Sequence, residues 1–169
     1  MQITQLDKTR HNREKFDCGV RALNEYLKKT ARQHDRLDLS RTFVLTDQNS
    51  PQDILGFYSL STCRIDWPEL PENLRKKYPN TSMSAALIGR LAVDLKKQGQ
   101  GYGGDLLIDA ITNIVSSVAH LALPLIVVDA KDDKAQRYYE KFGFEPIAPS
   151  SRRLFMTVKH AKEMLDSVS

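Results

Sequence analysis

A glycine-rich segment in the middle of the chain constrains its fold most. Residues 98–104 contain four glycines, follow a strand-like apolar run and precede a helix-like amphipathic run. Because glycine has no Cβ, successive backbone N–H groups in such a segment can converge on an anion. The first turn of the following helix adds unpaired donors and the positive end of its dipole. The segment therefore predicts a phosphate-binding loop between a strand and a helix.

Two classes of pyrophosphate cofactor are bound by loops of this kind. The G-x-G-x-x-G pattern of dinucleotide-binding proteins is matched by Gly99, Gly101 and Gly104. Asp129 ends a later apolar run where a ribose-binding acid would be expected. The Q/R-x-x-G-x-G/A pattern, the coenzyme A loop of GNAT N-acetyltransferases, is matched by Gln98, Gly101 and Gly103. The loop alone leaves both assignments open.

The surrounding sequence favours coenzyme A. In a dinucleotide-binding unit the first glycine follows its strand almost directly, whereas residues 94–98 intervene here. Residues 130–169 are too few to complete a doubly wound sheet, and hairpin patterns precede the loop. No Gly-Lys-Ser/Thr follows the glycines, which excludes a Walker phosphate loop.

Composition predicts one globular domain over residues 1–169, because a chain of this length can bury a single core. Hydrophobic residues make up 41% and charged residues 27%, and no apolar run approaches the roughly 20 residues that span a membrane. The N-terminus begins with strand-like alternation and has no signal segment, so we expect no membrane association and a cytoplasmic location. The net charge of +4 favours an anionic partner.

Neither a disulfide nor a metal site is expected. Cys18 and Cys63 lie far apart and outside any C-x-x-C spacing. The histidines share no ligand spacing.

Periodicity predicts one mixed α/β sheet. The expected order begins with a strand at residues 1–6, a helix capped by Asp17, and a hairpin of strands 42–46 and 54–62 joined by a long turn. A strand at 85–93, a helix at 101–119 and a buried strand at 125–128 follow. The chain is expected to end with a short helix from Asp132 or Asp133 to near Gly143, a strand at 153–158 and one or two helical turns in the tail. The connection 63–84 is long and irregular, which is typical of a functional or mobile segment.

Three segments, in this order and spacing, resemble the GNAT superfamily of acetyltransferases. They are residues 90–94, the loop at residues 98–103, and residues 135–144, which read Ala-Gln-Arg-Tyr-Tyr-Glu-Lys-Phe-Gly-Phe. The resemblance extends from about Thr42 to Val158. It implies a mostly antiparallel sheet, splayed at its central strands and covered by helices on both faces, with acetyl-CoA as co-substrate. Tyr138 stands where phenylalanine is commoner, which should leave the chemistry unchanged.

Within that superfamily the chain resembles the acetyltransferase toxins of bacterial toxin-antitoxin modules. The matching segments are residues 16–19, 23–27, 41–44, 56–60 and 89–94, so the resemblance covers nearly the whole chain. It implies acetylation of the α-amine of aminoacyl-tRNA, which blocks translation. It also implies a ribbon-helix-helix antitoxin and a homodimer, for which the strand 153–158 is one candidate contact edge.

The same resemblance implies roles for individual residues. Tyr139 would be the general acid for the coenzyme A thiolate, because a phenol with an ordinary pKa of about 10 stays protonated at neutral pH. A backbone N–H of the strand before the loop would polarise the thioester carbonyl. The expected cofactor-binding residues are Leu91, Ala92, Val93, Gln98, Gly99, Gln100, Gly101, Tyr102, Gly103 and Gly104.

Basic residues are the candidates for acceptor binding, foremost Arg90, Arg32 and Arg41. Arg90 stands in an apolar strand beside the expected acetyl site. The wider set comprises Arg21, Lys28, Lys29, Arg36, Arg75, Lys76 and Lys77. Contacts of these side chains with phosphates would make binding depend on salt. No carboxylate stands out as a general base, and Asp129 is expected to make local turn bonds.

Two other functions fit the same fold. One is acetylation of a small amine or a protein lysine, with the connection 63–84 shaping a different acceptor pocket. The other is a binding module that retains the fold without catalysis. Acetylation of charged tRNA, with polyamines and peptides inert, would distinguish the toxin from an acetyltransferase of small amines or protein lysines. Turnover of any amine would exclude the binding module.

Overall fold

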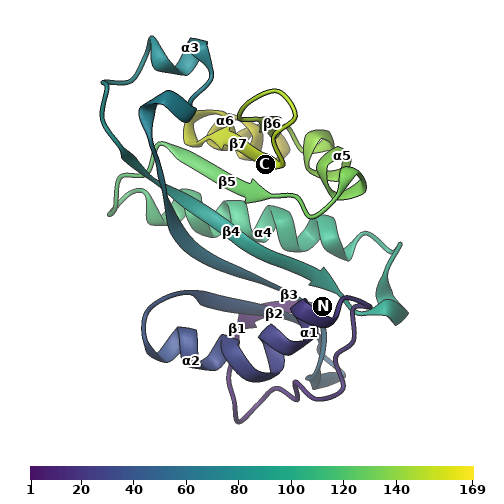
Figure 1. The fold of residues 1–169 in the computed structure, drawn as a ribbon. Helices are drawn as coiled ribbons and strands as arrows, with labels where there is room; N and C mark the ends of the chain where they lie inside the picture. The colour runs from purple at the N-terminus through teal and green to yellow at the C-terminus, as the bar shows by residue number, and fades with distance from the viewer. The chain divides into compact units, whose positions relative to one another are not determined.

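The computed structural model describes residues 1–169, which divide into two units (Figure 1). The first unit comprises Met1–Ser61 and Gly89–Ala110, and the second comprises Thr62–Ile88 and Ile111–Ser169. Three elements pass from one unit to the other: β3 (Ser50–Ile65), β4 (Met83–Val93) and α4 (Tyr102–Ser117). None of the helices has the length and apolar character needed to cross a membrane.

In the first unit the strand order is β1-β2-β3-β4. Strand β1 (Gln2–Gln5) pairs antiparallel with β2 (Arg41–Asp47), which pairs antiparallel with β3. The expected long turn of the hairpin is wrong, because Asp47 already pairs with Ser50 and only two residues connect the strands. The carboxylate of Asp47 accepts a hydrogen bond from the N–H of Asn49 at 2.9 Å, which closes the turn.

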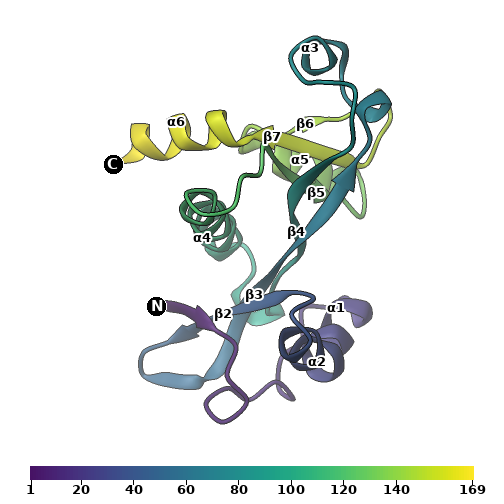
Figure 2. The same ribbon diagram turned by 90° about the vertical axis from the view of Figure 1, so that its left-hand side faces the viewer.

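Strand β3 is covered on both faces within the first unit. Successive side chains of a strand point to opposite faces. Phe57 stacks on Tyr26 with ring centroids 6.1 Å apart, while the backbone of Gly56, on the other face, approaches Leu106 of α4 so closely that a Cβ would lie 2.8 Å from it. Helices α1 (Arg21–Glu25) and α2 (Ala31–Arg36) thus cover one face (Figure 2), and the start of α4 covers the other.

The first helical region departs from the expected single helix. A π-helical turn, Tyr26–Thr30, separates α1 from α2, and the N–H of Ala31 bonds to the carbonyl of Tyr26 five residues earlier. Asp17 is not the N-cap, because its carboxylate instead accepts bonds from the N–H of Gly19 and the amide of Asn24, both at 2.8 Å. Val20 occupies the cap position without a side-chain bond.

In the second unit the strand order is β3-β4-β5-β7-β6. Strand β5 (Leu125–Asp129) pairs parallel with β4 and antiparallel with β7 (Arg153–Thr157), and β7 pairs antiparallel with β6 (Glu145–Pro146), a strand that the sequence did not predict. Strand β6 pairs with β7 only at Leu154 and Phe155. The expectation that residues 153–158 form a contact edge of a dimer stays a prediction.

Two expectations about the second unit need correction. Asp129 makes no turn bond; its carboxylate accepts two bonds from Arg153 on β7, at 2.8 and 3.0 Å. The tail forms the 11-residue helix α6 (Val158–Val168), longer than the one or two turns expected. Its N-cap is Thr157, whose hydroxyl accepts a bond from the N–H of His160 at 3.1 Å, and buried Ala161 anchors it.

The irregular connection between β3 and β4 is ordered. It contains a 3₁₀ turn, Trp67–Glu69, and the short helix α3 (Glu72–Arg75). The indole N–H of Trp67 donates to the carbonyls of Arg75 and Tyr78, at 3.2 and 3.1 Å, and so ties the two ends of the segment together. The predicted mixed α/β fold, with a mostly antiparallel sheet, is confirmed.

Candidate functional site

The glycine loop begins after β4 with a 3₁₀ turn, Leu95–Lys97. Asp94 caps this turn, since its carboxylate accepts a bond from the N–H of Lys96 at 3.0 Å. The same carboxylate accepts a bond from the N–H of Asp17 at 3.1 Å, and the N–H of Leu95 donates to the carbonyl of Asp17 at 2.8 Å. The spacer that separates strand and glycines is therefore a structured turn held by the N-terminal segment.

Gln98 holds the start of the loop. Its side-chain amide donates to the carbonyl of Val93 at 2.9 Å and to the carbonyl of Cys18 at 3.1 Å. The backbone angles of Gln98 (φ −66°, ψ 153°), followed by φ +75° at Gly99, are those of a type II turn. The glutamine of the loop motif thus acts as a brace between the end of β4 and the N-terminal segment.

Three consecutive donors are exposed where the loop enters α4. Gly101, at φ +89°, accepts bonds from the N–H groups of Gly104 and Asp105 at 3.0 and 3.2 Å and so starts the helix. The N–H groups of Gly101, Tyr102 and Gly103 donate to no acceptor in the chain. A Cβ placed on Gly101 would meet nothing within 4 Å, so the space beside the loop is open. Free donors at the positive end of a long helix are suited to a phosphate.

The part of β4 next to the loop has one strand neighbour. The parallel pairing of β4 with β5 covers Ala86, Leu87 and Ile88 and ends there. The predicted cofactor-binding residues Leu91, Ala92 and Val93 follow in the same strand, and Ala92 is buried in the core of the first unit. Their backbone groups on the β5 side have no strand partner, so an extended ligand can hydrogen bond to them as an added strand.

Tyr139 lies in the second unit, in the last turn of α5 (Asp133–Lys141). The predicted caps are confirmed: the carboxylate of Asp132 accepts a bond from Ala135 N–H at 2.8 Å, and Gly143 has φ +95°. The carbonyl of Tyr139 accepts a bond from the N–H of Phe144 at 3.3 Å, which closes a Schellman motif. These bonds fix the backbone that carries the phenol.

Burial raises the pKa of Tyr139 to about 12, with a smaller contribution from the neighbouring Tyr138. The ring contacts those of Tyr138 and Phe144, with centroids 5.7 and 6.0 Å apart. Burial disfavours the charged phenolate, so the hydroxyl holds its proton throughout the neutral range. Tyr139 is therefore suited to donate a proton and unsuited to act as a base.

The raised pKa predicts the shape of the pH profile. A group that acts in its protonated form is active below its pKa, and for Tyr139 this range extends to about 12. We therefore expect kcat, measured under single-turnover conditions with a saturating amine, to show no decline with an apparent pKa near 10. A decline near that ordinary tyrosine value would show that Tyr139 is not desolvated in the working enzyme.

Two of the predicted acceptor-binding arginines have clear partners in the first unit. The guanidinium carbon of Arg90 lies over the ring of Tyr26, 3.6 Å from the ring centroid. Arg41 donates to the carboxylates of Asp35 and Asp38 and, at 2.8 Å, to the carbonyl of Asp35. The bond with Asp38 raises the pKa of Arg41. Arg41 thus connects the start of β2 to the end of α2, a structural role that the sequence did not indicate.

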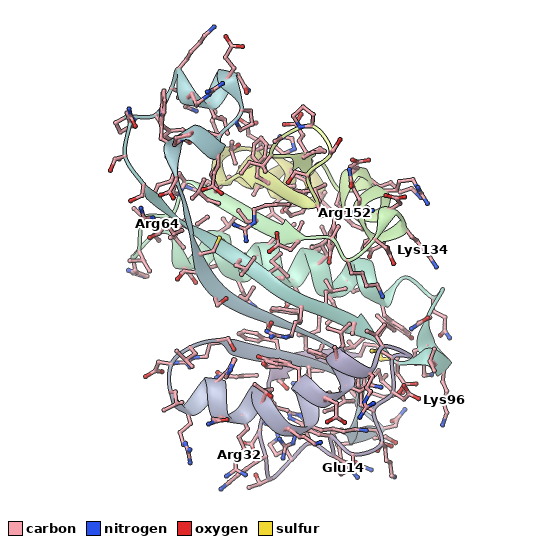
Figure 3. The ribbon with its side chains drawn as sticks, viewed as in Figure 1. Glu14, Arg32, Arg64, Lys96, Lys134 and Arg152 are labelled. Carbon is pink, nitrogen blue, oxygen red and sulfur yellow. The ribbon has the colours of Figure 1, made fainter.

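The third arginine, Arg32, lines a basic hollow of about 320 Å³ on the first helical region. Figure 3 shows Arg32 extending from α2 on the side away from the strands. The hollow is lined by Arg13, Lys28, Lys29, Arg32, Gln33 and Arg36. Arg13 and Gln33 were not predicted, although the spacing of Lys28, Arg32 and Arg36 by four residues indicates a shared helical face.

The remaining basic candidates lie elsewhere. Arg75, Lys76 and Lys77 are at the end of α3, in the second unit. The structure therefore groups the glycine loop, Arg90 and the basic hollow in the first unit and places Tyr139 in the second. No three His, Cys, Asp or Glu side chains are grouped so that they could hold a metal ion.

Comparison with known proteins gives the family. The acetyltransferase (GNAT) domain model matches residues 38–146. The chain is 32% identical to the "tRNA-acetylating toxin" of Mycobacterium tuberculosis, over 89% of this chain and 88% of that protein. It is 29% identical to the "Probable toxin TacT" of Sinorhizobium fredii, over 96% of this chain and 94% of that protein.

Solved structures agree over the whole chain. A tyrosine-to-phenylalanine mutant of KacT superposes with a TM-score of 0.91 at 26% identity, covering 96% of this chain and 98% of that one. AtaT complexed with acetyl-methionyl-tRNAfMet gives 0.88 at 27% identity, with 97% and 98% covered. AtaTR bound with acetyl-CoA gives 0.84 at 28% identity, with 97% of both chains covered. By sequence and by structure, this chain belongs to the GNAT acetyltransferase family.

Proposed function

We propose that this chain is a toxin that transfers an acetyl group from acetyl-CoA to the α-amine of aminoacyl-tRNA and thereby blocks translation, with residues 1–169 acting as one acetyltransferase domain. The observation that carries the enzymatic part is the row of free N–H groups at Gly101, Tyr102 and Gly103 at the start of α4, beside open space. The relatives that act on tRNA, at 27 to 32% identity, support the acceptor.

The residues of the first unit fit coenzyme A. The free N–H groups of the loop and the dipole of α4 would hold its pyrophosphate. The backbone groups of Leu91, Ala92 and Val93 that face the β5 side, apart from the Val93 carbonyl that Gln98 occupies, would hydrogen bond to its pantetheine arm, and one of these N–H groups would polarise the thioester carbonyl. When bound, acetyl-CoA supplies an activated acetyl group. Holding that group and the amine together provides much of the acceleration, about 7 to 11 kcal/mol in well-oriented systems.

Tyr139 would supply the proton that the chemistry consumes. As the new C–N bond forms and the C–S bond breaks, negative charge develops on the departing sulfur, and the phenol donates its proton there. A pKa of about 12 keeps the phenol protonated at neutral pH, so the proton is available when the sulfur departs. Water then restores the proton. The ammonium of an aminoacyl ester is comparatively acidic, so water can also remove its proton, and the chain needs no general base.

The basic hollow would bind phosphates of the acceptor. Lys29 is paired with Glu25 at 2.5 Å, whereas Lys28, Arg32 and Arg36 have no carboxylate partner. Replacing these three by glutamine should raise KM for charged tRNA. The slope of log K for tRNA binding against the logarithm of the salt concentration should also decrease in magnitude by about two. Each lost phosphate contact removes roughly 0.7 to 0.9 from this slope.

A variant of equal charge change serves as the control for the hollow. Lys141, Lys159 and Lys162 are exposed in the second unit, and their replacement by glutamine should change the slope much less. Equal slopes for the two triple variants would show that only the net charge of the protein matters.

The experiment that tests the function is expression in bacteria combined with analysis of the tRNA pool. Expression should arrest growth, lysates should contain acetylated aminoacyl-tRNA, and Tyr139→Phe should relieve the arrest. Unimpaired growth, or activity on polyamines or peptides with charged tRNA inert, would contradict the proposal. The partner expected from the family of toxins is a ribbon-helix-helix antitoxin, for which the neighbouring reading frame is the place to search. Charged tRNA as acceptor implies the cytoplasm, and the homodimer stays a prediction.

A further inference from the structure

The contact between Arg90 and Tyr26 joins two parts of the first unit that are far apart in sequence. The guanidinium carbon of Arg90 lies 3.6 Å from the centroid of the Tyr26 ring, within the range of a strong cation–π contact. Arg90 is in β4, directly before the backbone that fits the pantetheine arm. Tyr26 is the first residue of the π-helical turn.

Tyr26 is held rigidly on every side. Its side chain is 4% exposed. Its hydroxyl bonds to the hydroxyls of Ser40 and Thr42, at 2.9 and 3.3 Å, and its ring contacts those of Phe57 and His34. A buried tyrosine needs partners for its hydroxyl, and here these bonds and the ring contacts together fix the position of the ring. The ring therefore presents a fixed surface to Arg90.

The π-helical turn is the backbone feature that accompanies this contact. In this turn the N–H of Ala31 bonds to the carbonyl of Tyr26, and the carbonyl of Lys28 accepts a bond from the Arg13 guanidinium at 3.0 Å. Such single turns occur frequently at functional sites. The bond from Arg13, which lies outside the helix, stabilises the π-helical turn.

Arg90 uses one face of its guanidinium in this stack and keeps its donors. It has no ion pair with a carboxylate and no side-chain hydrogen bond, in contrast to Arg41, which is saturated by Asp35 and Asp38. A stacked arginine still offers its N–H groups at the edge of the plane, in a geometry that matches phosphate or carbonyl oxygens. Its orientation is fixed before any ligand binds, which lowers the entropic cost of binding.

We propose that Tyr26 is a positioning residue: it stacks against the Arg90 guanidinium so that the free N–H groups of Arg90 hydrogen bond to an oxygen of the acceptor, a phosphate or ester oxygen at the aminoacylated end of tRNA. This inference rests on the proposed function. It assigns Tyr26 an effect on the acceptor alone, because the side chains of Tyr26 and Arg90 are not among the groups assigned to acetyl-CoA.

A double-mutant cycle in the full-length protein tests the inference. Tyr26→Leu and Arg90→Ala should each raise KM for aminoacyl-tRNA about tenfold and leave KM for acetyl-CoA unchanged. The double variant should be no worse than Arg90→Ala, because Tyr26 acts only through Arg90. Tyr26→Phe keeps the ring but loses the bonds to Ser40 and Thr42, so its KM for aminoacyl-tRNA should rise less than that of Tyr26→Leu. The inference would be overturned if the rise in KM for aminoacyl-tRNA in the double variant were the product of the rises in the two single variants. It would also be overturned if the single variants raised KM for acetyl-CoA equally.

Arg90→Lys provides a second test that leaves the buried Tyr26 in place. Lysine keeps the charge but lacks the planar group that stacks and offers donors at its edge. KM for charged tRNA should therefore rise nearly as much in Arg90→Lys as in Arg90→Ala. A wild-type KM in Arg90→Lys would overturn the inference. If the wild-type protein fails to acetylate any charged tRNA, the proposed function itself is overturned. If the wild type is active but the free-energy effects of Tyr26→Leu and Arg90→Ala add in the double variant, only the role of Tyr26 is overturned.

Discussion

Replacing Tyr139 by phenylalanine is expected to lower kcat for acetyl transfer by about 10²- to 10³-fold and to leave KM for acetyl-CoA nearly unchanged. The phenol would act only as the C–S bond breaks, so its loss should affect the chemical step and not the binding of the cofactor. The aromatic ring, which contacts Tyr138 and Phe144, is retained in the variant. The measurement is single-turnover kinetics with charged tRNA, together with calorimetric titration of acetyl-CoA.

Tyr138→Phe is the matched control, because it removes a hydroxyl from the adjacent tyrosine of the same helix. Its kcat should remain within a few-fold of the wild type. If the two variants lose activity equally, the loss reflects the packing of α5 rather than a proton donated by Tyr139. If Tyr139→Phe keeps its full kcat, the proton comes from elsewhere.

Replacing Gly101 by valine is expected to raise the dissociation constant of acetyl-CoA about tenfold or more. At φ +89° a β-branched residue is strained by about 1 to 3 kcal/mol. Because a Cβ there meets nothing within 4 Å, the strain comes from the backbone conformation and not from a clash. The loop can relieve it by turning the peptide groups of Gly101 and Tyr102, which moves the N–H donors away from the pyrophosphate.

Gly103→Ala is the corresponding control in the same loop. Gly103 lies in the first turn of α4 and does not have a positive φ, and the loop motif accepts alanine at this position. Calorimetric titration should therefore show a dissociation constant close to the wild-type value. A similar loss in both variants would point to the volume of the side chain, and an unchanged constant for Gly101→Val would exclude the loop donors from cofactor binding.

The sequence predicted best those parts whose structure depends on neighbours in the chain. The strand before the loop, helix α4, the N-cap at Asp132 and the C-terminal glycine Gly143 follow from local hydrogen-bonding rules, and all are present. The sequence favoured a coenzyme A loop over a dinucleotide loop because the order of elements around the glycines differs from that of a dinucleotide-binding unit.

The parts that were missed depend on contacts between distant residues. The π-helical turn begins at Tyr26, whose ring packs against Phe57 and Arg90, and these contacts are not visible in the periodicity of the sequence. Arg41 was expected to bind the acceptor, but Asp35 and Asp38 approach it only once α2 and β2 have packed. The pairing of Asp129 with Arg153 likewise requires the register of β5 and β7.

The bonds that join Asp17 and Cys18 to Asp94, Leu95 and Gln98 carry a consequence for the limits of the functional chain. The family model begins at residue 38, so a chain trimmed to that boundary would keep every glycine of the loop. It would lose Cys18, one of the two partners of the Gln98 amide, and Asp17, the anchor of the spacer turn. The sequence recognised as the acetyltransferase domain is therefore shorter than the sequence that gives its cofactor loop a shape.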